Sequence, residues 1–281
     1  MKIIQYLGGL GNQMFQHAFY LAMRKQFNTK ADIRQFGNYK LHNGYELDKV
    51  FGIVLDQASN FQTNLYYNPE GKFIFRKLRR VLGLKNSVYR EKDEFRYDDR
   101  VFDNTSQYYI GYWQNEQYFK SIKTQLLKEF TFKSDLKGKN LEHKNSISNS
   151  NSIAIHVRRG DYINHPFLGN ICDLGYYQQS IQTISERVEN PHFYVFSNDI
   201  VWCRENIKAD TITYVDENIK QNSFIDMQLM SLCKHQIIAN SSFSWWAAWL
   251  NPNTGKIVIA PRKWINLESD IDILPQDWIQ I

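Results

Sequence analysis

The residues best suited to chemistry follow directly after the alternating apolar segment 153–157: two arginines, a glycine and an aspartate, Arg158-Arg159-Gly160-Asp161. Such a segment predicts a buried strand, which brings its last residues to the edge of a sheet where open α/β folds bind ligands. Arginine can hold a phosphate through two parallel hydrogen bonds, and glycine allows a sharp turn or a close backbone approach. The pattern predicts a bound anion, although a structural salt bridge accounts for it equally well.

Two further polar groups follow predicted strands, Ser197-Asn198-Asp199 and Asn240-Ser241-Ser242. The carboxyl ends of parallel strands share one edge, so all three groups are expected in one crevice. The third group, which starts at Asn240, continues to Ser244 and is also a good helix N-cap, whose free N–H groups can bind phosphate. Asp226 begins the preceding predicted helix. It can accept hydrogen bonds from a guanine, or simply favour the helix N-terminus.

A glycine-rich turn near the start of the chain links a predicted strand, 3–7, to a predicted helix, 14–27. Strand, glycine turn and helix form a layout that points free backbone N–H groups at an anion. The turn lacks the full dinucleotide fingerprint, and a purely architectural role explains it as well. Its candidate ligand-binding residues are Gly9, Gly11, Asn12 and Gln13.

The elements that position these residues alternate between strand and helix in the second half of the chain. Strands are predicted at 153–157, 193–196, 211–215, 236–239 and, as the last, 256–260, and helices at 175–187, 223–233 and 245–250. Such alternation predicts a parallel α/β sheet. Residues 135–152 are polar and small, without period, and are expected to be a linker or a long surface loop. We therefore expect two domains, 1–150 and 151–281, with the C-terminal tail able to pack back on the first.

Composition bounds the remaining possibilities. The formal net charge of +5 suits an anionic small ligand or an anionic membrane surface and is too small to indicate nucleic-acid binding. The three widely spaced cysteines predict neither a zinc site nor disulfides. With no signal segment or long apolar run, we expect a cytoplasmic protein. Residues 72–85 hold a basic amphipathic helix, which either packs on its own core or contacts the inner face of the membrane.

Four motifs occur in order along the chain, at 8–16, 156–162, 196–199 and 239–246. They are Gly-Gly-Leu-Gly-Asn-Gln-Met-Phe-Gln, His-Val-Arg-Arg-Gly-Asp-Tyr, Phe-Ser-Asn-Asp and Ala-Asn-Ser-Ser-Phe-Ser-Trp-Trp. This set resembles the motifs of the α-1,2-fucosyltransferases of bacteria and animals. The resemblance spans almost the whole chain, with residues 28–150 the least diagnostic part. The animal members have an N-terminal membrane anchor, which this chain lacks, so it is similar to the bacterial type.

The resemblance implies a GT-B architecture, in which two Rossmann-like domains face each other across a cleft and the C-terminal one binds GDP-fucose. It implies inverting transfer of L-fucose to the 2-hydroxyl of a terminal galactose, for instance in O-antigen synthesis, with no metal and no cofactor. The one D-x-D sequence, 270–272, lies in the tail rather than at a strand end. Partners are then GDP-fucose and a galactose-terminated or lipid-linked glycan, and no nucleic acid.

The same resemblance assigns roles to individual residues. Arg158 binds the β-phosphate, His156 lies near the nucleotide, Asp226 holds the guanine, and Gly11 and Asn12 lie on the pyrophosphate or fucose side. Without a metal, a guanidinium and N–H groups at a helix N-terminus must stabilise the charge that develops on the β-phosphate. The full set of donor-binding residues is Gly9, Gly11, Asn12, Gln13, His156, Arg158, Arg159, Asp226, Asn240, Ser241, Ser242 and Ser244.

The base that accepts the proton of the acceptor hydroxyl is expected to be Asp161, with His165 as second choice. Asp161 can equally serve to position the arginines, and late proton transfer to phosphate or water needs no base. Three rival functions stay open at this stage. They are a fucosyltransferase of α-1,6 or protein-O linkage, a nucleotide-binding module without catalysis, and nucleic-acid binding through 76–80.

Overall fold

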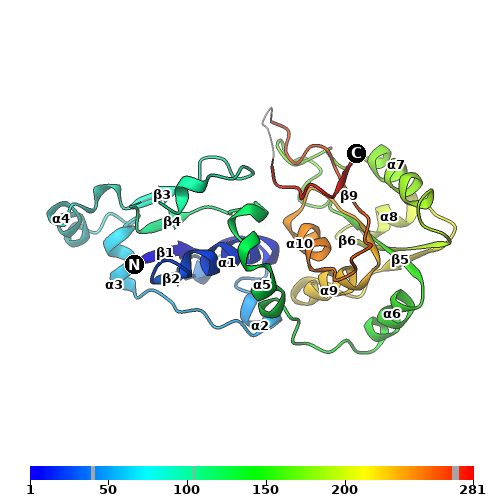
Figure 1. Cartoon of the computed structure of the whole chain (residues 1–281), viewed down its shortest axis with the longest axis horizontal. Coiled ribbons are helices and arrows are strands. Elements are labelled where there is room, and N and C mark those ends of the chain that lie inside the picture. The colour runs from blue at the N-terminus through cyan, green and yellow to red at the C-terminus, as the bar shows by residue number, and fades with distance from the viewer. Residues whose placement is uncertain (39–41, 104, 268–271) are drawn as a thin grey trace. The chain divides into compact units, whose positions relative to one another are not determined.

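The structure, a computed structural model, describes residues 1–38, 42–103, 105–267 and 272–281. The chain divides into two compact units, residues 1–133 and 134–281, and each is built on its own β-sheet (Figure 1). Every strand pairing among the described residues is parallel. The predicted α/β class with two parallel-sheet units is therefore confirmed. No helix in the described part of the chain is long and apolar enough to cross a membrane.

Unit 1 has a four-stranded sheet of order β2-β1-β4-β3. Its strands are β1 Lys2–Gln5, β2 Thr29–Asp32, β3 Val88–Arg90 and β4 Tyr108–Ile110. Its α-helices are α1 Leu10–Arg24, α2 Leu47–Phe51, α3 Asn60–Tyr66, α4 Phe73–Val81 and α5 Lys123–Glu129. Short 3₁₀ turns are η1 Arg34–Asn38, η2 Leu84–Asn86, η3 Asp99–Val101, η4 Glu116–Tyr118 and η5 Lys120–Ile122.

Aromatic side chains fill the core of unit 1. Phe19 of α1 stacks on Trp113 with ring centroids 4.1 Å apart, and Tyr118 meets Trp113 edge-on. Trp113 and Tyr109 are fully buried. Rings packed in this way bury large apolar areas, so the abundant aromatics of this region stabilise the fold.

Unit 2 has a six-stranded sheet of order β10-β9-β8-β5-β6-β7. Its strands are β5 Asn151–Val157, β6 Pro191–Ser197, β7 Ile212–Val215, β8 His235–Ile237, β9 Val258–Ala260 and β10 Ile279–Gln280. Its helices are α6 Lys139–Ser148, α7 Leu174–Ser185, α8 Ile200–Asn206, η6 Lys220–Asn222, α9 Phe224–Leu232 and α10 Ser242–Leu250. The three cysteines of this unit are free, as the spacing predicted.

β5 is one of the two central strands of the second sheet, and it contains the apolar segment 153–157. Ile153, Ile155 and Val157 are buried in one cluster with β6 and α7 residues, and Ala154 is buried as well. A strand covered on both faces is mostly apolar, and Ser152 and His156 are the buried polar residues of β5. β6 pairs with one side of β5 and β8 with the other.

The predicted linker at 135–152 is wrong, because most of it forms α6. Ile147 of this helix is fully buried. Ser146 Oγ lies 2.6 Å from the Tyr194 hydroxyl of β6, and the Asn140 amide exchanges hydrogen bonds with Asn218 at 2.9 Å. These contacts attach α6 to the second sheet. The division between units therefore falls at 133/134, about seventeen residues before the expected boundary at 150.

The end of the chain also differs from expectation. β9 is not the last strand, because β10 adds to the sheet beyond it, with Ile279 paired to Ile259. The Trp278 ring lies 5.6 Å from the Trp245 ring of α10. The described part of the C-terminal tail thus belongs to unit 2. Within the D-x-D sequence, positions 270 and 271 lie outside the described residues.

Candidate functional site

The three polar strand ends of unit 2 lie next to one another. β8, β5 and β6 are adjacent and parallel, so the residues after each of them share one edge of the sheet. Side-chain contacts join the groups. Asn198 and Asp199 of the second group bond to Arg159 of the first, and Phe243 of the third lies 5.6 Å from the His156 ring. The meeting of the three groups that the sequence predicted is confirmed.

Arg158 is the cation at the centre of this edge. Its Nη2 donates to Asp161 Oδ2 at 2.8 Å, and its guanidinium lies over the Tyr162 ring at 5.5 Å. Its Nε is buried and has no hydrogen-bond partner among the described residues. Burying a charged donor without a partner is costly, so this N–H group suits an anionic ligand.

Arg159 is held within the protein more firmly than its neighbour. Its Nε donates to Asp199 Oδ2 at 3.2 Å, and its guanidinium stacks over the Trp202 ring at 4.0 Å. Its backbone N–H donates to Asn198 Oδ1 at 3.0 Å. The geometry of Arg159 therefore joins β5 to the start of α8, while its predicted contact with a ligand stays a prediction.

Gly160 lies close against the side chain of Asn198. A Cβ on Gly160 would lie 2.5 Å from Asn198 Nδ2, closer than side-chain atoms pack. A larger residue would therefore push away the amide that accepts the Arg159 N–H. The glycine of the Arg-Arg-Gly-Asp group serves this close approach.

The start of α10 presents free donors at the same edge. Ser241 is the N-cap, and its hydroxyl accepts the Phe243 N–H at 3.4 Å. Ser242 is partly exposed, and its hydroxyl has no partner among the described residues. Its hydroxyl and the first N–H groups of the nine-residue helix together suit a phosphate.

Two polar residues of the third group brace the protein itself. Ser244 is fully buried, and its hydroxyl donates to Ala239 and Ser241 carbonyls, both at 3.3 Å. The Asn240 amide donates to the carbonyls of Leu168 and Trp264 at 3.1 and 3.2 Å. Asn240 thereby fixes the segment 158–169 against the chain that follows β9. The ligand contacts predicted for Asn240 and Ser244 stay predictions.

His156 is buried beside Arg158. Burial, and to a smaller extent the nearby Arg158 charge, together lower the pKa of its imidazole to about 3. The ring is therefore neutral at physiological pH. Its Nδ1 is buried without a hydrogen-bond partner among the described residues. A neutral ring with an unused nitrogen can bond a ligand without adding charge, which agrees with a position near a nucleotide.

Asp226 lies in the first turn of α9 and is partly buried. Burial raises the pKa of its carboxyl to about 8, the hydrogen bond from Asn218 acts to lower it, and the Glu217 carboxylate acts to raise it. Asn218 Nδ2 donates to Asp226 Oδ1 at 2.7 Å, and Asn218 is itself bonded to Asn140 of α6. The sequence missed this Asn140–Asn218 support because α6 carried no helical signal.

His165 is unsuited to the role of base. Its Nδ1 accepts the backbone N–H groups of Phe167 and Leu168, both at 3.2 Å. A neutral imidazole has one acceptor nitrogen, and here that nitrogen closes a turn. Asp161 is exposed and bonded to Arg158, so both of its predicted roles stay open.

The glycine turn of unit 1 precedes α1, which begins at Leu10, four residues before the predicted start. Gly8 has a φ of +89°, a conformation that glycine adopts without strain. Gly9 is the N-cap, and Gly11 and Asn12 lie in the first turn. The Asn12 Oδ1 accepts from Gln114 at 2.9 Å.

Gln13 is committed to the fold of unit 1. Its Nε2 donates to the carbonyls of Gly8 and Gly44, both at 2.8 Å, and its Oε1 accepts the Glu46 N–H at 2.9 Å. The side chain is fully buried. These bonds explain Gln13 as a brace of the turn, and the ligand contacts of Gly9, Gly11, Asn12 and Gln13 stay predictions.

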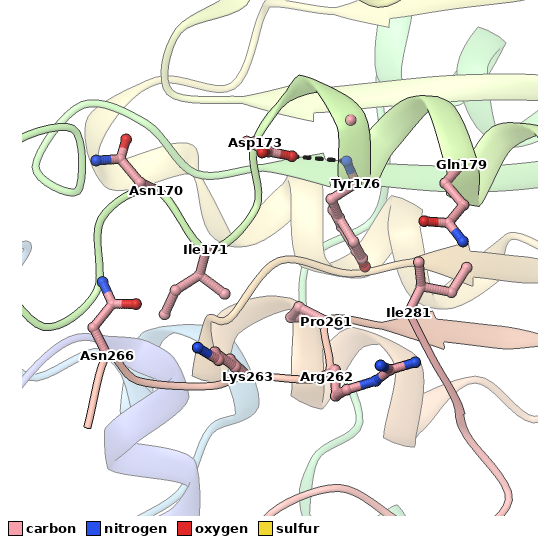
Figure 2. Close-up of a pocket in the computed structure, with 11 residues that line it drawn as sticks. Asn170, Ile171, Asp173, Tyr176, Gln179, Pro261, Arg262, Lys263, Asn266 and Ile281 are labelled. Atoms are coloured by element: carbon pink, nitrogen blue, oxygen red, sulfur yellow. Dashed lines mark hydrogen bonds between the residues drawn. The ribbon is translucent and has the colours of Figure 1, made fainter. Parts of the chain in front are cut away.

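An open hollow of about 570 Å³ lies in unit 2 between the start of α7 and the segment after β9 (Figure 2). Arg262 and Lys263 line it from that segment, and Asp173 and Gln179 from the α7 side. Asn266, also in the lining, donates to the Gly169 carbonyl at 2.7 Å, so the hollow adjoins the end of the 158–169 segment. No sequence motif pointed to it, because its residues come from separate parts of the chain.

No group of three or more His, Cys, Asp or Glu side chains in the described ranges is placed to hold a metal ion. This concerns the protein's own ligands and leaves the metal dependence of any reaction to experiment.

The chain is similar to several known proteins. The model of glycosyl transferase family 11 matches residues 71–281. An alpha-1,2-colitosyltransferase of Escherichia coli is 35% identical, over 99% of this chain and 98% of that protein. The O-antigen biosynthesis glycosyltransferase WbnK of Escherichia coli is 31% identical, over 98% of each. Among solved structures, fucosyltransferase NodZ from Bradyrhizobium aligns over 89% of this chain and 93% of its own, with 12% identity and a TM-score of 0.49.

Proposed function

Since this chain is a glycosyltransferase that belongs to glycosyl transferase family 11, we propose that it transfers L-fucose from GDP-β-L-fucose to the 2-hydroxyl of a terminal galactose, with inversion. The acceptor is a glycan of a bacterial surface polysaccharide of the O-antigen kind. The name of the relative WbnK, which is similar over almost its full length, supports this role.

The observation that carries the donor assignment is the buried Nε of Arg158, which has no hydrogen-bond partner in the described part of the chain and lies at the sheet edge from which α10 starts. In the proposed reaction the acceptor oxygen bonds to C1 of fucose, and the bond from C1 to the β-phosphate oxygen breaks. Its electron pair stays on the phosphate. The Arg158 guanidinium, the Ser242 hydroxyl and the first N–H groups of α10 can stabilise that charge together.

Protein groups alone can supply this stabilisation, so we propose that no metal or cofactor is required. A guanidinium and helix N–H groups hold their charge in place before the reaction and need no reorganisation during it. Turnover measured with and without EDTA tests the point. A loss of activity in EDTA that Mg²⁺ or Mn²⁺ restores would contradict it.

We assign to Asp226 the role of binding the nucleobase. A guanine offers two adjacent donors, and an ionised carboxylate can accept both. The raised pKa of Asp226 requires that this carboxyl lose its proton when the base binds at neutral pH. The Asn140–Asn218 pair keeps the carboxyl oriented from the side of α6.

Asp161 is our proposed base, which accepts the proton of the attacking hydroxyl. Its carboxylate is exposed on the surface of unit 2, where an acceptor can reach it. Its ion pair with Arg158 gives it a second role, since the same carboxylate positions the guanidinium.

A second candidate function is transfer of colitose. It is supported by the 35% identity to an alpha-1,2-colitosyltransferase. Colitose is fucose without the 3-hydroxyl, so one donor site can be shaped for either sugar. A site built to bond that hydroxyl rejects the deoxy sugar strongly, whereas a site shaped for the deoxy sugar discriminates less.

The deciding experiment is a transfer screen with GDP-fucose and GDP-colitose, each offered with β-1,3- and β-1,4-linked galactosides. We expect turnover with GDP-fucose and, by NMR of the product, a new α-1,2 linkage. Faster turnover with GDP-colitose would transfer the assignment to the second candidate. An α-1,6 product, transfer to a protein hydroxyl, or binding of GDP-fucose without any turnover would each overturn the proposal.

A further inference from the structure

Helix α4 is the least buried helix of unit 1, and none of its nine residues is buried. It lies beside α3 at one end of the unit (Figure 1). Only one side of it packs, where the Phe75 ring lies 5.7 Å from the Phe61 ring and Arg79 Nη1 donates to the Tyr66 carbonyl. The sequence left open a surface helix that packs on its own core, and the packing found here is confined to the side that faces α3.

Large apolar side chains remain on the other sides of α4. The exposed fractions are 72% for Phe73, 64% for Ile74, 74% for Val81 and 56% for Leu82, the residue that caps the helix. At about 100° per residue, Ile74 and Val81 lie on the same side of the helix. Exposed apolar residues that gather in this way mark a surface that is covered by a partner.

Positive charge surrounds this apolar surface. Residues 72–85 contain six Lys or Arg and no Asp or Glu. Because the formal net charge of the whole chain is +5, the remaining residues are together close to neutral. Viewed down the helix axis, Lys77 projects between Phe73 and Val81. The Arg76 guanidinium lies over the Phe73 ring at 5.8 Å. Cations on long stems beside apolar side chains can reach phosphate groups while the apolar atoms enter a lipid layer.

We propose that α4, with residues 72–85, docks unit 1 on the surface of an anionic lipid bilayer. The helix lies in the plane of the headgroups, with Phe73, Ile74 and Val81 among the acyl chains and Arg76, Lys77 and Arg80 on the lipid phosphates. The mixture of the two kinds of side chain favours lipid over other partners. A nucleic acid would use the cations and leave the apolar residues in water, and a second protein chain would need acidic residues opposite them.

The test measures co-sedimentation of the full-length protein with vesicles of phosphatidylcholine alone and of phosphatidylcholine with about one-third phosphatidylglycerol. We expect binding to the anionic vesicles, at least about tenfold weaker binding to the neutral ones, and weakening with salt. Equal binding to both compositions, or none to either, would overturn the proposal, as would tighter binding to RNA than to anionic vesicles.

Two variants separate the contributions of the helix. Phe73→Ser/Ile74→Ser/Val81→Ser removes the apolar side chains, and Arg76→Gln/Lys77→Gln/Arg80→Gln removes the charges. Each should lower vesicle affinity about tenfold or more. Matched controls change residues of similar exposure elsewhere, Val54→Ser/Val201→Ser and Lys25→Gln/Lys120→Gln/Lys128→Gln. We expect the controls to bind as the unchanged protein does, and vesicle affinity unaffected by both α4 variants would refute the inference.

Transfer to a water-soluble acceptor serves as the second readout. Residues 72–85 do not belong to the donor site, so both α4 variants should retain soluble turnover while losing vesicle binding. If the apolar variant fails to fold, the charge variant alone decides the question. The inference does not depend on the identity of the donor sugar, so a failure of the proposed function leaves it standing.

Discussion

Arg158 and Asp161 form an ion pair within a single turn after β5, with Arg158 Nη2 donating to Asp161 Oδ2 at 2.8 Å. The pair uses one edge of the guanidinium and leaves the buried Nε without a protein partner among the described residues. The Tyr162 ring lies beneath the guanidinium, 5.5 Å from it. One carboxylate and one ring therefore set the direction in which Arg158 presents its remaining donors.

Replacing Arg158 tests its role in stabilising the departing phosphate. Arg158→Ala should lower kcat about 100-fold or more, as expected for the loss of one preorganised donor. Arg158→Lys should recover little, because an ammonium lacks the planar fork that reaches Asp161 and a phosphate together. Steady-state kinetics with GDP-fucose give the result. Near-normal turnover in Arg158→Ala would remove this residue from the mechanism.

Asp161→Asn separates a base from a positioning residue. The amide oxygen can still accept from Arg158 Nη2, but the amide cannot take up a proton. If Asp161 is the base, kcat should fall about 100-fold or more and the limb of the pH–rate profile that reports a base should disappear. A small loss with an unchanged pH profile would indicate that Asp161 only orients Arg158.

The raised pKa of Asp226 predicts a pH dependence of nucleotide binding. Its carboxyl must be ionised to accept the guanine donors, and its pKa in the free protein is about 8. GDP affinity should therefore rise as pH increases from 6.5 towards 8, by up to about tenfold per unit, and level off above that pKa. Titration calorimetry in buffers of different ionisation enthalpy should detect one proton released on binding.

Asp226→Asn supplies the control for this dependence, because its amide does not titrate. The variant should bind GDP more weakly and with no rise between pH 6.5 and 8. The free energy of unfolding depends on pH in the opposite direction to GDP affinity. A carboxyl with a raised folded-state pKa favours the folded state when protonated, and this contribution is lost as pH rises through about 8. The variant should therefore lose less stability than the unchanged protein between pH 7 and 9.

The sequence was informative where local pattern and topology agree. The apolar segment 153–157 and the strand–helix alternation predicted a parallel sheet, and parallel strands necessarily bring their polar ends together. The same reasoning could not separate ligand-binding from bracing residues. Gln13 and Asn240 stand in polar motifs, yet their amides bond to carbonyls 31 and 72 residues away in the chain. Such partners are set by tertiary structure and leave no local signal.

The helix α6 was missed for a related reason. Of its ten residues only Ile147 is buried, so it lacks the periodic apolar face that reveals a helix in a sequence. Its bonds to Tyr194 and Asn218 span 48 and 78 residues. The Asn140 support of Asp226 leaves no local signal either, because it depends on the packing of α6 against residues far along the chain.

Gly160→Ala tests the close approach at the turn after β5. The new Cβ would meet Asn198 Nδ2 at 2.5 Å and force the side chain from its bond with the Arg159 N–H. We expect a destabilisation of about 1–2 kcal/mol, typical of overpacking, and a lower kcat as the turn carrying Arg158 shifts. Gly255→Ala is the matched control, since its Cβ would approach only Asn253 Oδ1, at 3.7 Å. Equal behaviour of the two variants would show that the approach is relieved without cost.

Ile147→Ala tests whether α6 belongs structurally to unit 2. Ile147 is fully buried, and removing its outer carbons should destabilise the unit by about 3 kcal/mol through lost burial and a residual cavity. Leu141→Ala on the same helix is the control, because Leu141 is 42% exposed and should cost under about 1 kcal/mol. Denaturant unfolding followed by tryptophan fluorescence reports mainly unit 2, since six of the seven tryptophans lie after residue 133. A tryptophan transition that Ile147→Ala leaves unmoved would mean that α6 is a linker, as the sequence had suggested, and that Asn140 cannot support Asp226.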